Sequence, residues 1–428
     1  MVIRNAKLRK KDGLYDITYE NGVFTSINPA KEFDKDILPN PWEISDIFDE
    51  VDVDGRVVME PFVEPHIHLD CVLTAGIPHY NMSGTLFEGI STWHEYKTSQ
   101  PLVVSEIKDR ARQALRMMAS YGVQFVRTHV DITETSFKGV QALEELKEEM
   151  KDYMEIQTIA FPQNGILSFR DENGTGKDYM KKALDAGMDV VGGIPHFEYT
   201  REYGIESLKF IFEMAEKYDK PIDVHCDEID DGSSRFLETL ATLAWEREMG
   251  DRTVAAHTCA MGSYNDAYCT KLFRLLKDSK VSFNSCPNAS IHLQGRIDTY
   301  PKRRGLTRIK ELYHEGINVC LGQDSISDPW YPMGVGDLLR VLDSGIHIAQ
   351  MTGYEDLKNC LDLISVNGAH NLCLDNEYGI KTGKKASFIV LDGKDDLDII
   401  SHHKPVVLSV HNGKIIAKRK PERSIVEF

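Results

Sequence analysis

The chain has 428 residues, of which 42% are hydrophobic and 27% charged, a composition typical of a globular enzyme with a large core. Its formal charge is 50 − 67 = −17, which argues against binding of a nucleic acid polymer, because such binding relies on basic side chains that neutralise phosphates. No apolar run reaches the roughly 18 residues of a membrane span, so no membrane partner is expected.

The cysteines and the first residues predict the cellular compartment in which the protein is found. The eight cysteines form no Cys-x-x-Cys pair and show no even spacing. The first residues lack the apolar core and cleavage site of a signal peptide. We therefore expect reduced thiols and a cytoplasmic protein.

Short alternating segments at both ends of the chain predict a small β domain. Strands are expected at residues 2–6, 15–19 and 23–27, and again at 386–391, 405–410 and 414–417. Asn-Gly pairs at residues 21–22 and 412–413 are typical of hairpin turns. We expect one discontinuous β-sandwich, built from residues 1–58 and 376–428.

The middle of the chain, residues 59–375, alternates strand-like and helical segments. Strands are expected at 62–69, 124–131, 155–161, 189–194, 222–225, 253–257, 281–284 and 318–321. Helices are expected between them, for example at 105–121, 139–152, 205–218, 235–248 and 268–276. Eight such units favour an α/β fold of the (β/α)8 TIM-barrel type, with an open doubly wound sheet as the alternative. The first strand is followed by no glycine-rich phosphate loop, which counts against the open sheet.

Candidate metal ligands stand at the ends of several predicted strands, where a barrel carries its chemistry. His66 and His68 are two residues apart at the end of the first strand, so their side chains point the same way. His225 ends the fifth strand and Asp324 follows the eighth. Three imidazoles and a carboxylate suit one Zn²⁺ or Fe²⁺ ion.

Two further polar residues fit the same site. Glu228 follows His225 by three residues, and His257 ends the sixth strand. A metal ion can lower the pKa of a bound water to about 7. A nearby glutamate can then take its proton and pass it to a leaving group.

The whole set resembles the amidohydrolase superfamily, and more closely the bacterial cytosine deaminase family. The similarity to that family is carried by residues 83–90, 160–167, 194–198, 223–230, 291–296 and 328–332. It implies one divalent metal ion per subunit, Zn²⁺ or Fe²⁺, held by His66, His68, His225 and Asp324. It also implies a small-molecule substrate and a homo-oligomer.

The resemblance further implies roles for the remaining site residues. Glu228 would shuttle the proton and His257 would orient the attacking water. Gln163 and the backbone of Leu86 would bind the edge of a pyrimidine, and Trp330 would close the pocket. The implied activity is hydrolytic deamination of a small cyclic amidine.

Three positions depart from the cytosine deaminase pattern. Gln323 stands where the family usually has histidine, and Ser325 where cytosine-specific members have a second aspartate. Asn288 adds a polar group to a loop that is apolar in the family. The loss of a carboxylate at Ser325 should make room for an extra methyl group, as on 5-methylcytosine or creatinine. Cytosine-type pyrimidines and creatinine are therefore the substrate candidates.

Two other kinds of function are considered. Ring-opening amide hydrolysis usually uses two metals and a carboxylated lysine, but the fourth strand ends in Ile194-Pro195-His196. A non-catalytic binding protein would have no use for a proton carrier at Glu228.

Overall fold

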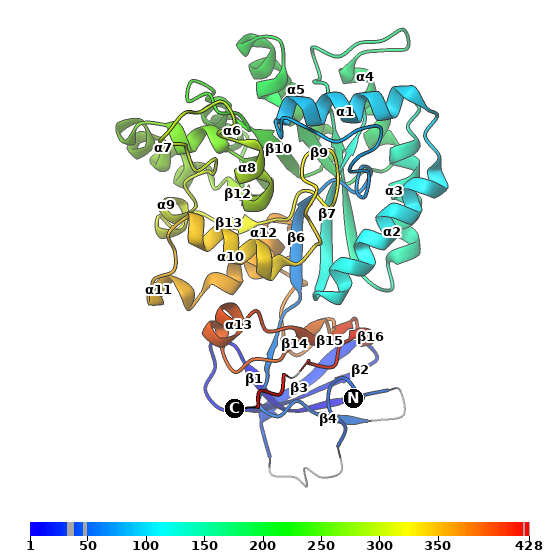
Figure 1. Ribbon diagram of the computed structural model, residues 1–428, viewed down its shortest axis with the longest axis vertical. Helices are drawn as coiled ribbons and strands as arrows, with labels where there is room; N and C mark the ends of the chain where they lie inside the picture. The colour runs from blue at the N-terminus through cyan, green and yellow to red at the C-terminus, as the bar shows by residue number, and fades with distance from the viewer. Residues whose placement is uncertain (32–37, 46–48, 423, 428) are drawn as a thin grey trace.

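The computed structural model describes residues 1–31, 38–45, 49–422 and 424–427. These residues form a barrel of parallel strands and a separate, smaller sheet (Figure 1). The barrel and its helices fill the upper part of the view, and both chain ends lie in the smaller sheet below.

The barrel has eight parallel strands in chain order, and all eight predicted strands are present within two residues of the expected ends. Backbone hydrogen bonds of the predicted metal ligands close the barrel between its last strand and its first. The Asp324 N–H donates to the His66 carbonyl (2.8 Å), and the His68 N–H donates to the Asp324 carbonyl (3.2 Å). The predicted (β/α)8 fold is confirmed. Its strands are β6 (Phe62–Ile67), β7 (Val123–Asp131), β8 (Glu155–Phe161), β9 (Val190–Gly193), β10 (Ile222–Cys226), β11 (Thr253–His257), β12 (Ser282–Ser285) and β13 (Val319–Leu321).

Amphipathic helices surround the barrel and bury apolar residues three or four positions apart, as α2 does with Ile107, Ala111 and Leu115. The α-helices are α1 (Leu86–Ser99), α2 (Val104–Ser120), α3 (Lys138–Met150), α4 (Gly176–Asp185), α5 (Arg201–Tyr218), α6 (Phe236–Glu246), α7 (Asp266–Ser279), α8 (Pro287–Leu293), α9 (Ile309–His314), α10 (Leu338–Ile348), α11 (Tyr354–Leu357), α12 (Val366–Asn371) and α13 (Asp396–His402). Short 3-10 turns are η2 (Pro195–Phe197), η3 (Gly250–Arg252), η4 (Cys259–Ser263) and η5 (Cys360–Ile364).

The smaller sheet combines both ends of the chain, in the order β16-β15-β14-β5-β1-β2-β3 with β4 beside β1. The strands of the predicted β-sandwich form one continuous hydrogen-bonded series, because β1 pairs with two different strands. Its first half pairs with β4 and its last residues pair with β5, and the change falls around Asn5, which has φ 55°. β5 ends at Met59, one residue beyond the predicted boundary. The strands are β1 (Val2–Leu8), β2 (Tyr15–Glu20), β3 (Val23–Pro29), β4 (Glu50–Asp52), β5 (Val57–Met59), β14 (Phe388–Leu391), β15 (Val406–His411) and β16 (Lys414–Lys418).

The two Asn-Gly turns lie against each other. Asn21 and Asn412 both have φ 49°, and the glycines that follow them have φ 77° and 81°. A Cβ atom on Gly22 would lie 2.6 Å from the Asn412 carbonyl oxygen, so this contact requires glycine. The contact joins hairpins from opposite ends of the chain.

Gln124 connects the barrel to the smaller sheet. This buried residue near the start of β7 donates from Nε2 to the Ser409 hydroxyl and the Val410 carbonyl, each at 2.9 Å. Its Oε1 pairs with Nδ1 of the buried His411 at 3.0 Å. Because every partner is buried, the pairing of Gln124 with β15 fixes the sheet against the barrel.

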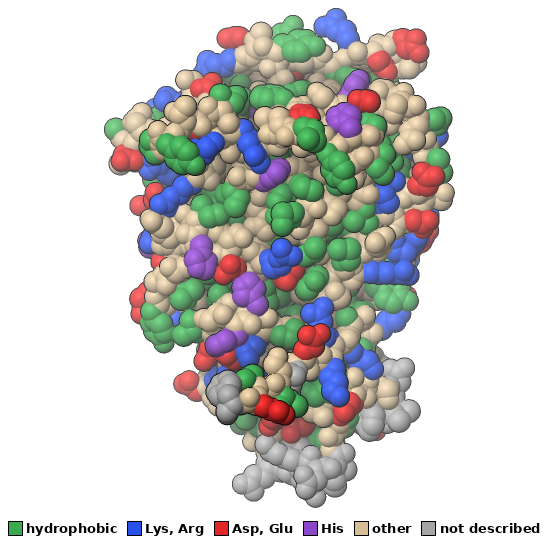
Figure 2. All heavy atoms as spheres, viewed as in Figure 1, with side chains coloured by type: hydrophobic (Ala, Val, Ile, Leu, Met, Phe, Trp, Pro, Cys, Tyr) green, Lys and Arg blue, Asp and Glu red, His purple; other side chains and the backbone are tan. Residues whose placement is uncertain are grey.

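The outer surface carries charges of both signs. On the face shown in Figure 2, basic and acidic side chains are interspersed. No helix in the described part of the chain is both long and apolar enough to cross a membrane.

Candidate active site

Glu64 fixes β6, the strand that carries His66 and is followed directly by His68. Its carboxylate, fully buried in β6, accepts the N–H of His66 at 3.0 Å and the N–H of Gln323 at 3.0 Å. Burial raises the pKa of Glu64 to about 8, although these two N–H groups act to lower it. The same carboxylate therefore ties β6 to the segment that precedes Asp324.

Four imidazoles and one carboxylate converge at the C-terminal end of the barrel. His66 Nε2 lies 3.2 Å from His257 Nε2, and His68 Nε2 lies 3.2 Å from His225 Nε2. Asp324 Oδ1 lies 3.7 Å from His66 Nε2 and 3.5 Å from His68 Nε2. The structure thus brings together the predicted ligands, which come from β6 and the residue that follows it, from β10 and from the segment after β13.

This cluster fits a divalent metal ion. Ligand atoms about 2.1 Å from one ion lie about 3–3.5 Å apart, close to the distances between these nitrogen and oxygen atoms. Burial lowers the pKa of His68 to about 4, and burial also lowers the pKa values of His66 and His225 well below 6.5. The imidazoles are therefore neutral, which is the form that binds metal, and a nitrogen-rich set with one carboxylate suits Zn²⁺ or Fe²⁺.

Glu228 lies beside the cluster in the loop after β10. Burial raises the pKa of its carboxyl to about 8, and its Oε1 is 3.8 Å from His257 Nδ1. The preceding Asp227, at φ 53°, accepts the N–H groups of Phe236 and Leu237 at the start of α6. This loop is therefore held rigidly, with Glu228 facing the cavity.

A small cavity lies over the cluster. In this conformation its volume is about 20 Å³, room for a single water molecule, so the cavity must widen to take a larger ligand. Four predicted substrate contacts line it, namely Gln163, Leu86, Ser325 and Trp330. The other lining residues are His68, Ile90, Phe161, Ile194, His225, Glu228, His257, Leu293 and Asp324.

Asp328 organises the wall that carries Ser325 and Trp330. Its Oδ1 accepts the N–H groups of Trp330 (2.9 Å) and Tyr331 (3.0 Å). A hydrogen bond from the Ser325 side chain also lowers the pKa of Asp328, which burial nonetheless raises to about 6. Ser325 therefore supports the wall while occupying little of the cavity.

Gln323 acts outside the cavity. It is buried, and its Oε1 accepts the N–H of Gly336 at 3.1 Å. The side chain therefore holds the loop before α10, a positioning role that the sequence did not indicate.

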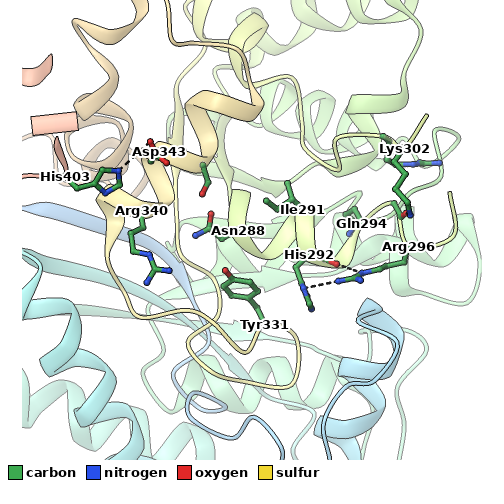
Figure 3. Close-up of a pocket in the computed structure, with 13 residues that line it drawn as sticks. Asn288, Ile291, His292, Gln294, Arg296, Lys302, Tyr331, Arg340, Asp343 and His403 are labelled. Carbon is green, nitrogen blue, oxygen red and sulfur yellow. Dashed lines mark hydrogen bonds and ion pairs between the residues drawn. The ribbon is translucent and has the colours of Figure 1, made fainter. Parts of the chain in front are cut away.

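Asn288 is the predicted contact that does not reach this cavity. It lies in the first turn of α8, and it lines a separate hollow of about 650 Å³ with Ile291, Tyr331 and Arg340. Figure 3 shows Asn288 in this hollow, next to Tyr331. In this conformation α8 lines the cavity with Leu293 and not with Asn288, so a contact between Asn288 and the substrate stays a prediction.

Sequence reasoning missed three groups near the site. His129, on β7, is fully buried with its ring centroid 4.1 Å from that of His66. Phe161 stacks on His225 at 4.2 Å. Glu198 accepts the N–H groups of residues 166–168 and so fixes the loop that follows Gln163. The end of β7 held the same strand-end signal as His66, but no second histidine followed it.

Helix α1 covers the cavity and is fastened at both ends. Thr85 caps its start by accepting the N–H of Glu88 (3.2 Å). Near its end, Lys97 forms an ion pair with Asp131 at the end of β7, and both side chains are buried. The helix therefore holds Leu86 and Ile90 over the histidines.

An eight-stranded barrel with this ligand set at its C-terminal end defines a metal-dependent hydrolase scaffold. The sequence profile of the Amidohydrolase family matches residues 81–417, and the chain belongs to that family.

Two known proteins are similar to this chain over nearly its whole length. The structure of 5-methylcytosine deaminase from Klebsiella pneumoniae, liganded with phosphonocytosine, is 46% identical, covers 100% of both chains and has a TM-score of 0.93. The same enzyme liganded with 5-fluorocytosine is 47% identical over 100% of this chain and 99% of that chain, also with a TM-score of 0.93. N-isopropylammelide isopropyl amidohydrolase of Pseudomonas sp. (strain ADP) is 28% identical over 98% of this chain and 97% of the relative.

Proposed function

We propose that this protein is a metal-dependent deaminase that hydrolyses 5-methylcytosine or cytosine to thymine or uracil and ammonia. One observation carries the proposal: a chain similar over its whole length to 5-methylcytosine deaminase also has the complete histidine, aspartate and glutamate set around one cavity.

The metal site consists of His66, His68, His225 and Asp324. When bound, a Zn²⁺ or Fe²⁺ ion there lowers the pKa of a coordinated water so that it is a nucleophile at neutral pH. The imidazole arrangement supports either ion, because both accept nitrogen and carboxylate ligands.

Glu228 is the proton carrier in this proposal. A carboxyl group whose pKa is raised by burial can both accept and release a proton near neutral pH. It takes a proton from the attacking water and gives it to the ring nitrogen. It then takes the proton of the hydroxyl group now on the ring carbon and gives it to the amine, which leaves as ammonia while the carbon becomes a carbonyl.

The remaining cavity residues bind and orient the base. His257 orients the attacking water, and Gln163 and the Leu86 backbone recognise the polar edge of the ring. Trp330 closes the cavity over the base. These assignments rest on the position of each residue in the cavity wall.

Ammonia release tests the proposal directly. Purified, zinc-loaded protein is assayed with cytosine, 5-methylcytosine and creatinine side by side, and chelator-treated protein is the control. We expect a pyrimidine to have the highest kcat/KM and the chelated protein to be inactive until zinc is restored. Absence of ammonia from all three substrates would overturn the deaminase assignment.

Ser325 determines how well the methyl group is tolerated. A carboxylate in its place would crowd the cavity beside Asp328, and overpacking of this kind costs about 1–3 kcal/mol. Ser325→Asp should therefore lower kcat/KM for 5-methylcytosine about 10- to 100-fold more than for cytosine. Ser325→Ala is the control that should preserve the preference. An equal loss with both bases would remove Ser325 as a specificity residue.

Creatinine is the second candidate, favoured by the same small side chain at Ser325. If creatinine releases ammonia fastest, the protein is a creatinine deaminase. Homo-oligomerisation also stays a prediction, and the mass of the purified protein in solution would test it.

A further inference from the structure

His129 makes a contact with the metal cluster that the proposed function does not use. It lies on β7, fully buried, and its Nε2 is 3.0 Å from Nδ1 of His66. The opposite nitrogen of His66, Nε2, faces His257 and Asp324. One nitrogen of His66 therefore faces the cluster and the other faces His129.

The position of His129 determines the tautomer of His66. A metal ion needs the lone pair of His66 Nε2, so the hydrogen must be on Nδ1. That hydrogen can be donated to His129 Nε2, which then has its own hydrogen on Nδ1.

A buried ion pair between Arg127 and Asp223 lies near the two histidines. His129 Nδ1 and Asp223 Oδ1 are both buried without a partner, one as a donor and the other as an acceptor. His66, His129 and Asp223 each offer one ligand atom, and these three atoms lie within 4.8 Å of one another. Asp223 Oδ2 in turn accepts from Arg127 Nη1 at 3.3 Å.

We propose that His129 is a positioning residue for the metal site and acts on it through His66. It accepts the Nδ1 hydrogen of His66 and so holds the His66 ring with Nε2 toward the ion. The assignment rests on the proposed metal site, but not on the identity of the substrate.

Two substitutions separate this role from simple packing. His129→Leu fills a similar volume with no acceptor. His129→Gln presents its terminal amide oxygen near the place of Nε2 and can still accept from His66. Losing the outer partner of a metal-binding histidine weakens metal affinity about 10- to 100-fold. We therefore expect that loss in His129→Leu and recovery to within about 3-fold in His129→Gln.

Zinc affinity is measured by competition with a chromophoric chelator, and the visible spectrum of the Co²⁺-loaded protein reports ligand geometry. The spectrum should change in His129→Leu and match the parent in His129→Gln. His411→Gln changes a buried histidine of the smaller sheet and should leave zinc affinity unaltered. If His129→Leu does not fold, His129→Asn replaces it, because its amide reaches the place of Nδ1 and not of Nε2.

Parent-like zinc affinity in the Leu or Asn variant, or equal loss in the Gln variant, would overturn the proposal. At saturating zinc, kcat should fall in His129→Leu while KM stays the same. A protein that shows these zinc affinities but releases no ammonia would refute the deaminase function and leave the role of His129 standing.

Discussion

Burial is the dominant influence on the ionisable side chains of the cavity. It keeps the ligand histidines neutral and raises the pKa of the Glu228 carboxyl to about 8. A hydrolytic site needs both neutral imidazoles and a carboxyl group that releases its proton near neutral pH, and burial in one cavity supplies both.

Glu228→Gln tests the proton carrier. Glutamine keeps the shape of the side chain but carries no exchangeable acid proton, so turnover should fall by about 10²- to 10⁴-fold. Zinc content per chain should equal that of the parent, because Glu228 lies outside the predicted ligand set. Turnover within tenfold of the parent would contradict the assignment.

At the scale of elements, helix α1 forms the cover of the cavity, so the cavity depends on the contacts that hold this helix. The ion pair between Lys97 and Asp131 is buried, so removing one partner leaves an uncompensated charge. Thr133 still donates to Asp131 Oδ1 through its N–H and its hydroxyl and limits the loss.

Lys97→Met should lower the free energy of unfolding by about 3 kcal/mol, as found when a buried pair loses one partner. The double variant with Asp131→Asn should recover part of that loss, because no unpaired charge remains. Urea denaturation of the two variants and the parent gives the comparison. A single variant as stable as the parent would show that the pair contributes nothing to holding α1.

Regular elements were largely predictable from sequence, whereas positions set by long-range packing were not. The strands at 155–161 and 253–257 match prediction because their apolar runs are short and bounded. Helix α1 was not predicted, since Gly89 and Thr92 on its buried face weaken the apolar stripe formed by Ile90, Trp93 and Tyr96. The position of Asn288 outside the cavity was not predictable, because the direction of α8 depends on its packing against other elements.

The predicted ligands came together because each stands at the end of a parallel strand, and a barrel places those ends around one axis. The role of His129 could not be predicted, since the sequence of β7 does not show which neighbouring ring the His129 side chain contacts. The same holds for Gln323, whose partner Gly336 belongs to a later loop.

At the scale of the whole molecule, the junction between barrel and sheet contains a buried histidine. His411 pairs through Nδ1 with Gln124, and its Nε2 pairs with the Asn412 amide at 3.0 Å. Burial lowers the pKa of His411 to about 4, below the ordinary value of 6.5.

This shift predicts a loss of stability in acid. Below pH 6.5 the unfolded chain binds a proton at His411 that the folded chain refuses until about pH 4, so stability falls across that window. The contribution is at most about 3 kcal/mol. His411→Asn should flatten the pH dependence of the unfolding free energy between pH 6.5 and 4, while the exposed His402→Asn should not. Parallel curves for His411→Asn and the parent would contradict the prediction.

The contribution of both chain ends to one sheet has a consequence for synthesis. On the ribosome, β5 appears early and pairs with β1, but its other partner, β14, begins only at Phe388. Throughout translation of the barrel, β5 therefore presents an open edge, the kind of surface on which nascent chains associate wrongly. Completion of the sheet comes last, and a chain interrupted before residue 388 would keep that edge exposed.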